Sequence, residues 1–219
     1  DRSIPPLGST ELNADGNTMT VSGGYAYIAS NDDAKELMVV RLSDYSLVNS
    51  VNLSGSADAT SVQTSGQTAY IARKKGSEAE FYSLNITSPE APITENGSVD
   101  LGDDQNVVDI VLSGTTVYVG TERERGAQDK KVAMINTSSN TLTGWVDFVD
   151  TENARAQALW MQGAYIYVGS SHSTETLQVV RGNEGGVYAD IGTFTSSAFD
   201  TGSATTTYDS LSWTTAGSG

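Results

Sequence analysis

The sequence predicts an all-β fold, a small β-propeller of about four antiparallel, four-stranded blades. Three observations predict it. The chain of 219 residues contains 22 glycines and many Ser and Thr residues, which are poor helix formers and common in turns. A motif built on a glycine and a tyrosine occurs four times, at spacings of 43, 48 and 49 residues that are typical of propeller blades. Each copy is flanked by further apolar runs of strand length.

The repeated motif is a turn glycine followed by a tyrosine within a run of β-branched and small residues. Its copies cover residues 24–30, 66–73, 114–121 and 163–170, and their anchoring tyrosines are Tyr27, Tyr70, Tyr118 and Tyr167. A Ser-Gly pair, or Gln-Gly in the last copy, provides the positive φ that a tight hairpin needs. The small residues after each tyrosine would let adjacent blades approach closely; they are Ala29, Ala72, Gly120 and Gly169.

Three more apolar runs accompany each motif and complete a four-stranded blade. First strands are expected at 19–21, 60–63, 107–112 and 157–161, third strands at 37–42, 80–86, 131–136 and 177–181, and fourth strands at 47–53, 93–101, 142–148 and 187–194. The blades then occupy about 17–55, 56–102, 103–150 and 151–194. One blade cannot bury both of its faces, so neighbouring blades must stack. A two-layer sandwich of about 16 strands is the alternative fold.

The two ends of the chain fall outside the repeat. Residues 4–12 resemble a fourth blade strand, which we expect either to pair with the last blade and close the ring or to end a further blade upstream. Residues 195–219 are expected to form an extra β-hairpin or the start of a truncated following domain.

The blade pattern resembles the LVIVD-type repeats of bacterial and archaeal surface propellers over about residues 15–194. The resemblance is carried by the pairs 26–29 with 39–44 and 69–72 with 84–89, although the usual Asp after the third strand is replaced by Leu42, Asn85, Asn136 and Gly182. The tail phrases 194–202 and 211–213 are similar to segments of pilin-like and large surface proteins of uncultured bacteria. These resemblances imply display at a cell surface or pilus, and binding rather than catalysis.

The charge balance limits the choice of partners. Twelve Lys and Arg residues face 27 Asp and Glu residues, for a formal net charge of -15. A field of this sign repels phosphate backbones and anionic lipid, so neither nucleic acid nor membrane insertion is expected. The chain has no cysteine and no apolar run of 18 residues. We expect an extracellular or cell-surface location.

Catalytic and metal motifs are weak in this sequence. The single histidine, His172, cannot build a histidine metal cluster, and its Ser- and Thr-rich neighbours indicate a solvated loop. No cofactor is expected, although oxygen-rich loops leave Ca²⁺ open. An alternative function is that of a glycan-active enzyme that uses carboxylates near the central channel, with Asp58, Asp103 and Asp109 as candidates.

The distribution of loops indicates a binding rim. The loops between second and third strands and between blades are long and charged and should share one rim, whereas turns such as 22–23 and 65–66 on the other rim are short and neutral. The candidate binding residues on the long-loop rim are Asp32, Asp33, Lys74, Lys75, Asp103, Asp104, Glu122, Arg123, Arg125 and His172. The favoured hypothesis is a non-enzymatic adhesion or binding module for a glycan or protein. A structural module that self-assembles is a further alternative.

Overall fold

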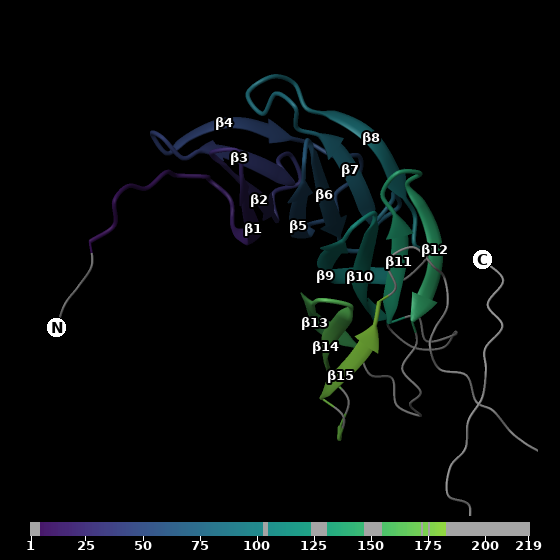
Figure 1. Ribbon diagram of the computed structural model, residues 1–219. Coiled ribbons are helices and arrows are strands. Elements are labelled where there is room, and N and C mark those ends of the chain that lie inside the picture. Colours follow the sequence, from purple (N-terminus) through teal and green to yellow (C-terminus); the bar gives the residue numbers. More distant parts are fainter. Residues whose placement is uncertain are drawn as a thin grey trace, which may run out of the picture. The chain divides into compact units, whose positions relative to one another are not determined.

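The computed structural model describes residues 5–102, 105–123, 131–146, 155–171, 173–174 and 176–182. The chain divides into two compact units, residues 1–189 and 190–219, and all described residues belong to the first. Among the described residues the first unit consists of fifteen β-strands in four antiparallel sheets (Figure 1). The described residues contain no helix that could span a membrane.

Each sheet is a simple meander in chain order. The first contains β1 (Gly16–Ser22), β2 (Tyr25–Ser30), β3 (Leu37–Arg41) and β4 (Ser46–Val51). The second contains β5 (Ala59–Ser65), β6 (Thr68–Arg73), β7 (Phe81–Asn85) and β8 (Thr94–Val99). The third contains β9 (Gln105–Ser113), β10 (Thr116–Arg123), β11 (Val132–Asn136) and β12 (Thr141–Val146). The fourth contains β13 (Ala156–Gln162), β14 (Tyr165–Ser170) and β15 (Leu177–Arg181).

This arrangement confirms the predicted all-β propeller with four repeats and excludes the two-layer sandwich. The four tyrosines lie at equivalent places in the second strand of each sheet, as the repeat predicted. The fourth strand expected at 187–194 and the tail at 195–219 lie outside the described residues.

The hairpins between first and second strands have the expected geometry. Gly23, Gly66, Gly114 and Gly163 have φ values of 58°, 56°, 51° and 59°, a region that costs glycine nothing and other residues much more. The same turn is therefore built four times, and it sets the register of each inner hairpin.

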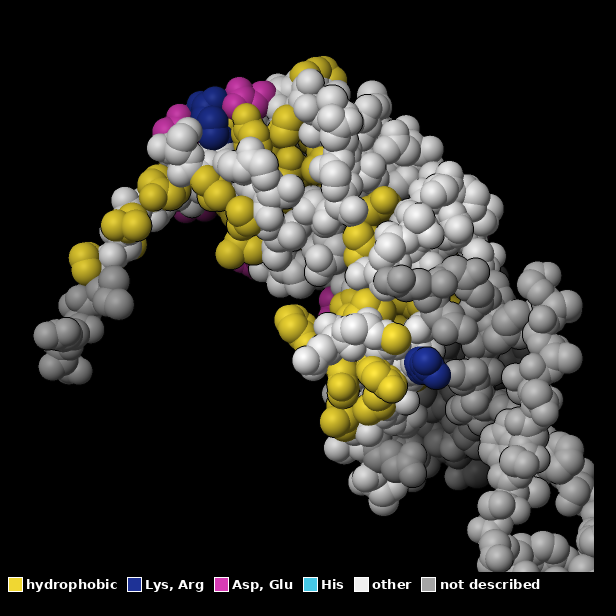
Figure 2. Space-filling model, viewed as in Figure 1, with side chains coloured by type: hydrophobic (Ala, Val, Ile, Leu, Met, Phe, Trp, Pro, Cys, Tyr) yellow, Lys and Arg dark blue, Asp and Glu magenta, His cyan; other side chains and the backbone are white. Residues whose placement is uncertain are grey.

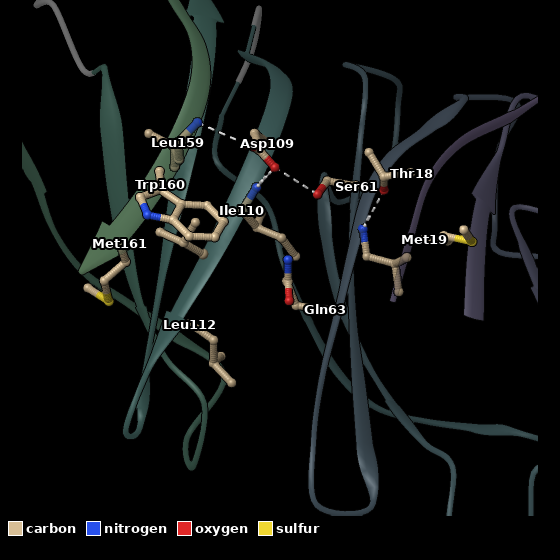
Figure 3. Close-up of a pocket in the computed structure, with 12 residues that line it drawn as sticks. Thr18, Met19, Ser61, Gln63, Asp109, Ile110, Leu112, Leu159, Trp160 and Met161 are labelled. Carbon is tan, nitrogen blue, oxygen red and sulfur yellow. Dashed lines mark hydrogen bonds between the residues drawn. The ribbon is translucent and has the colours of Figure 1, made fainter. Parts of the chain in front are cut away.

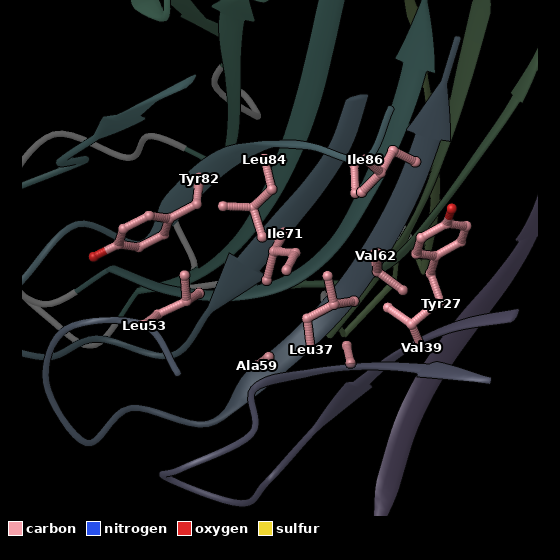
Figure 4. Packing of buried hydrophobic residues seen from close by; sticks show 12 residues of the cluster. Tyr27, Leu37, Val39, Leu53, Ala59, Val62, Ile71, Tyr82, Leu84 and Ile86 are labelled. Atoms are coloured by element: carbon pink, nitrogen blue, oxygen red, sulfur yellow. The ribbon is translucent and has the colours of Figure 1, made fainter. Parts of the chain in front are cut away.

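Hydrophobic side chains between consecutive sheets form three successive cores. The first joins the first and second sheets, and in Figure 4 Tyr27, Leu37 and Val39 point toward Val62 and Ile71. The second core joins the second and third sheets, and the third joins the third and fourth. The small residues after the tyrosines allow this approach: Ala29 and Ala72 are fully buried, and a Cβ on Gly120 would lie 3.1 Å from Leu159 Cγ.

The N-terminal segment differs from the expected closing strand. The described residues 5–15 belong to no sheet, and Leu7 is 93% exposed. Pro5 and Pro6 lack the amide hydrogen that a strand ladder requires, which explains why this segment does not extend a sheet. The part of the predicted strand 4–12 that the structure describes is therefore not formed, and the ring closure expected from this strand is not seen among the described residues.

Candidate functional site

The long loops of successive sheets lie at one edge, named here the long-loop edge. It is formed by loops 31–36 and 74–80 and by connections 52–58 and 100–102, because antiparallel meanders return these segments to the same ends of the strands. The opposite edge holds the short hairpins. The long-loop edge corresponds to the rim that the sequence predicted as the binding surface.

Predicted residues from the first two sheets lie at this edge and are engaged in polar contacts. Asp32 accepts a hydrogen bond from the Ala34 N–H at 2.9 Å and pairs with Lys35 at 3.5 Å, while Asp33 is exposed. Lys74 Nζ lies 2.7 Å from Asp58 Oδ2. Ion pairs that are partly exposed in this way stabilise a protein little, so their members remain available to exchange partners.

Two polar contacts join neighbouring sheets along the same edge. The backbone N–H of Lys75 donates to Asn106 Oδ1 at 3.0 Å, which links the second and third sheets. Arg155 Nη1 donates to Glu122 Oε1 at 2.9 Å, which links the third and fourth. Arg123 ends β10, and its side chain, like Asp103, Asp104, Arg125 and His172, lies outside the described structure.

Beneath the exposed charges lies a layer of buried ones, named here the buried charge layer, which the sequence pattern did not predict. It consists of Glu36, Arg73, Glu80 and Lys131, each at most 2% exposed. Three of them directly precede the third strand of their sheets. A charged residue at the same offset before each buried third strand is the signal that could have identified them.

The buried charge layer holds the backbone of the long loops. Arg73 donates to the carbonyl oxygens of Ser54 at 2.7 Å and Ala79 at 3.0 Å, and so joins two loop segments. Its guanidinium also lies over the Tyr82 ring, 4.7 Å from the centroid. Glu36 and Glu80 accept the N–H groups of Leu53 at 3.0 Å and Leu101 at 2.9 Å. These contacts fix where the first sheet passes to the second and the second to the third.

Burial shifts the acidity of both carboxyl groups in the layer. Loss of hydration raises the pKa of Glu36 and of Glu80 above their ordinary values, and the hydrogen bonds from Leu53 and Leu101 oppose the shift only partly. Arg73 Nη1 lies 3.8 Å from Glu36 Oε1, which has no hydrogen-bond partner. Burial of these charged groups below the loops therefore costs desolvation free energy.

The opposite edge is less neutral than the sequence suggested. Arg41 pairs with Asp44 at 2.9 Å and with Glu90 at 2.8 Å, and Tyr25 donates to the same Glu90 oxygen at 2.8 Å. The Arg41 guanidinium holds the pKa of Asp44 far below its ordinary value, and the Tyr25 and Arg41 hydrogen bonds lower the pKa of Glu90. This cluster joins the first sheet to the second, so its charges serve the packing of sheets.

A pocket of about 400 Å³ lies along the inner strands β1, β5, β9 and β13 (Figure 3). Its carboxylate, Asp109, accepts hydrogen bonds from Ser61 Oγ at 3.0 Å, from the adjacent Ile110 N–H at 2.8 Å and from the Leu159 N–H at 2.9 Å. The two carboxylate oxygens therefore bind the second, third and fourth sheets together. Asp109 serves as a link between sheets, which weakens the enzyme alternative.

The other two carboxylates of the enzyme alternative do not join Asp109 in a site. Asp58 pairs with Lys74 at the long-loop edge, and Asp103 lies outside the described residues. Within the described part of the chain there is no group of three His, Cys, Asp or Glu side chains suited to a metal ion. A Ca²⁺ site, which the sequence leaves open, is not tested by this, because two of the acidic loops lie partly outside that description.

Comparison with known proteins identifies the first repeat and supports the propeller fold. Residues 15–58 match the family model of the LVIVD repeat. The crystal structure of BamB from Moraxella catarrhalis, a β-propeller, is similar with a TM-score of 0.53 and 17% identity, over 81% of this chain and 47% of that one. The chain has a β-propeller fold, and its first repeat is similar to the LVIVD repeat.

Two designed proteins are also similar to this propeller. The computationally designed Ika4 protein gives a TM-score of 0.63 at 13% identity over 82% of this chain and 100% of its own. The designed Ika8 protein gives 0.56 at 15% identity over 75% of this chain and 45% of its own. The propeller thus spans less than half the length of Ika8 and BamB. No curated protein matches the sequence significantly.

Proposed function

We propose that this LVIVD-like propeller is a non-enzymatic binding module that recognises a glycan or a protein through its long-loop edge. The observation that carries the proposal is the buried charge layer beneath that edge. Arg73 alone bonds two loop segments, and Glu36 and Glu80 each hold a connection between sheets. Loops fixed in this way bind a partner without first losing conformational entropy.

The exposed and half-buried charged groups above the layer indicate a polar ligand. Lys74, Asp58, Asp32 and Asp33 offer both signs of charge, and the pairs among them are weak enough to open toward a partner. Because the whole chain carries a net charge of -15, the protein surface outside the long-loop edge would repel anionic polymers. Neutral or amphoteric surface glycans and proteins fit this charge pattern best.

An extracellular or cell-surface location belongs to the same proposal. The absence of cysteine from the sequence and its strongly acidic composition support it. The similarity of residues 15–58 to the LVIVD repeat also supports it, since the resemblance implies surface propellers.

The test is a binding screen against immobilised glycans and purified cell-surface proteins. We expect at least one interaction that weakens tenfold or more in Lys74→Ala and Asp32→Ala, because Lys74 is exposed and Asp32 half-buried at the long-loop edge. Gln162→Ala, at the hairpin on the opposite edge, is the matched control and should bind normally. Loss of binding in the control alone, or hydrolysis of a glycan by the wild-type protein, would refute the proposal.

A further inference from the structure

Among the described residues, the first and fourth sheets each have apolar side chains that no neighbouring sheet covers. In the first sheet these lie on β1, since Ala26, Met38 and Val40 of the same face are buried. The face of a sheet that is turned toward the previous sheet is called its leading face, and the face turned toward the next sheet its trailing face. The trailing face of the first sheet, with Tyr27, Leu37 and Val39, covers the leading face of the second, with Val62 and Ile71. The second and third sheets have both faces covered.

The trailing face of the fourth sheet repeats that of the first residue by residue. Strand pairing places Tyr165, Tyr167, Leu177, Val179 and Arg181 where the first sheet has Tyr25, Tyr27, Leu37, Val39 and Arg41. Leu37 and Val39 are completely buried, whereas Leu177 is 62% and Val179 54% exposed. Trp160 on the same face is 70% exposed, and hydrophobic side chains gather over β13–β15 in Figure 2.

The leading face of the first sheet is bare along its inner strand, β1. Met19 lies in the inner strand of the first sheet. By strand pairing, the equivalent inner-strand residues of the second, third and fourth sheets are Val62, Ile110 and Leu159. Those three are at most 6% exposed, but Met19 is 68% exposed, and Val21 beside it is 58% exposed. The sequence therefore places core residues on two surfaces that the described fold leaves in water.

The polar groups at the edge of the interface between the first and second sheets also have counterparts on the fourth and first sheets. In the first interface, Tyr25 and Arg41 bind Glu90, which lies in the turn between the third and fourth strands of the next sheet. The fourth sheet carries Tyr165 and Arg181 at the places of Tyr25 and Arg41. The corresponding turn of the first sheet carries Asp44, whose carboxylate already pairs with Arg41 at 2.9 Å and would be shared with the incoming residues. The fourth sheet thus has the complement of the first sheet's bare face.

We propose that the trailing face of the fourth sheet packs on the leading face of the first sheet of a second copy, and reciprocally. Two copies then form one closed ring of eight sheets. Each of the two new interfaces continues the pattern that the chain already builds three times. The four sheets of one copy match just under half of the Ika8 and BamB chains, so a ring of this kind has room for as many sheets again. Each interface joins two different faces. Because the ring closes after two copies, the assembly is a discrete dimer and not an open filament.

The experiment measures mass in solution for the full chain and for two variants that each block one face. Sedimentation velocity at micromolar concentration should show a wild-type dimer. Leu177→Lys/Val179→Lys blocks the trailing face, Met19→Lys/Val21→Lys blocks the leading face, and each variant alone should be a monomer. Mixing the two variants should restore a dimer, because each supplies the face that the other lacks.

A control variant shows whether the two apolar faces themselves carry the association. Leu142→Lys, an exposed outer-strand change in the third sheet, should leave the dimer intact, and circular dichroism should show that all variants fold. A monomeric wild-type chain would overturn the proposal, whether its ring closes on itself or on another partner. A dimer that survives in either blocked variant, failure of the mixture to dimerise, or open-ended growth would overturn it as well.

Discussion

At the scale of single residues, the buried charge layer is the least expected part of this protein. Charged side chains are rarely fully buried, yet Arg73 has no exposed surface and Glu80 is 2% exposed. Each binds backbone groups that would otherwise lack partners where one sheet passes to the next. A hydrophobic replacement would fill the space but leave those backbone groups unsatisfied.

The raised pKa of Glu80 predicts how stability depends on pH. Between the ordinary carboxyl pKa and the raised folded value, the native state keeps a proton that the unfolded chain has lost. The free energy of unfolding therefore falls as pH rises through this window. Glu80→Gln removes that loss, so the stability of the variant relative to wild type should improve from pH 4 to pH 8. The gain should be about 1.4 kcal/mol for each tenfold by which folding strengthens proton binding to the Glu80 carboxylate.

Urea denaturation of both proteins across this pH range measures the effect. Glu95→Gln, an exposed change on β8, controls for the altered net charge. A difference between Glu80→Gln and wild type that stays constant with pH, or that shrinks as pH rises, would show that Glu80 is already ionised without cost in the native state.

At the scale of elements, the repeat reproduces its irregularities as well as its strands. An extra residue bulges from the inner strand at the same place in every sheet: Asn17, Thr60, Val108 and Gln157. Thr18 and Asp109, each one residue beyond a bulge, accept an N–H group from the following sheet. The fourth sheet has Ala158 at this position, which offers no such acceptor.

The small residues after the tyrosines provide a matched test of sheet packing. A side chain added to Gly120 would press against Leu159 of the next sheet, so Gly120→Leu should destabilise the fold by about 1–3 kcal/mol. Gly169 is equivalent but meets only Ala158 of its own sheet, at 3.8 Å. Gly169→Leu should therefore change monomer stability by less than about 0.5 kcal/mol.

Thermal and urea unfolding at low protein concentration compare the two variants. Equal losses would mean that the trailing face of the fourth sheet is covered even in the monomer. In the proposed dimer the same Gly169→Leu change should weaken association, because Gly169 then faces a second copy.

At the scale of the whole molecule, charge and apolar surface act in opposite directions. A net charge of -15 on each copy opposes association, whereas the bare faces around Trp160 and Met19 favour it. Salt screens the repulsion and leaves apolar contact in place. Raising the ionic strength from about 0.01 M to about 0.15 M, which shortens the Debye length from ~30 to ~8 Å, should therefore increase the dimer fraction.

Sedimentation equilibrium at the two salt concentrations measures this dependence. Met19→Lys/Val21→Lys should remain monomeric at both. A dimer that dissociates as salt rises would indicate association through charge pairs instead of through the apolar faces.

The sequence by itself determined the repeated elements of this protein. A turn glycine, an alternating tyrosine-centred strand and small contact residues act over a few neighbours, so local patterns identified the strands, the hairpins and the propeller class. They also placed Asp32, Lys74 and Glu122 at one edge, since antiparallel strands return the chain to the same side.

Only the tertiary structure decided which groups are buried and which faces remain bare. Arg73, Glu80 and Asp109 appear polar in the sequence, and their roles arise from backbone groups of other strands and sheets. Leu177 and Leu37 have the same local pattern, yet one is exposed and the other buried, because only Leu37 faces a next sheet among the described residues. Long-range neighbours determine that, and periodicity along the chain does not encode them.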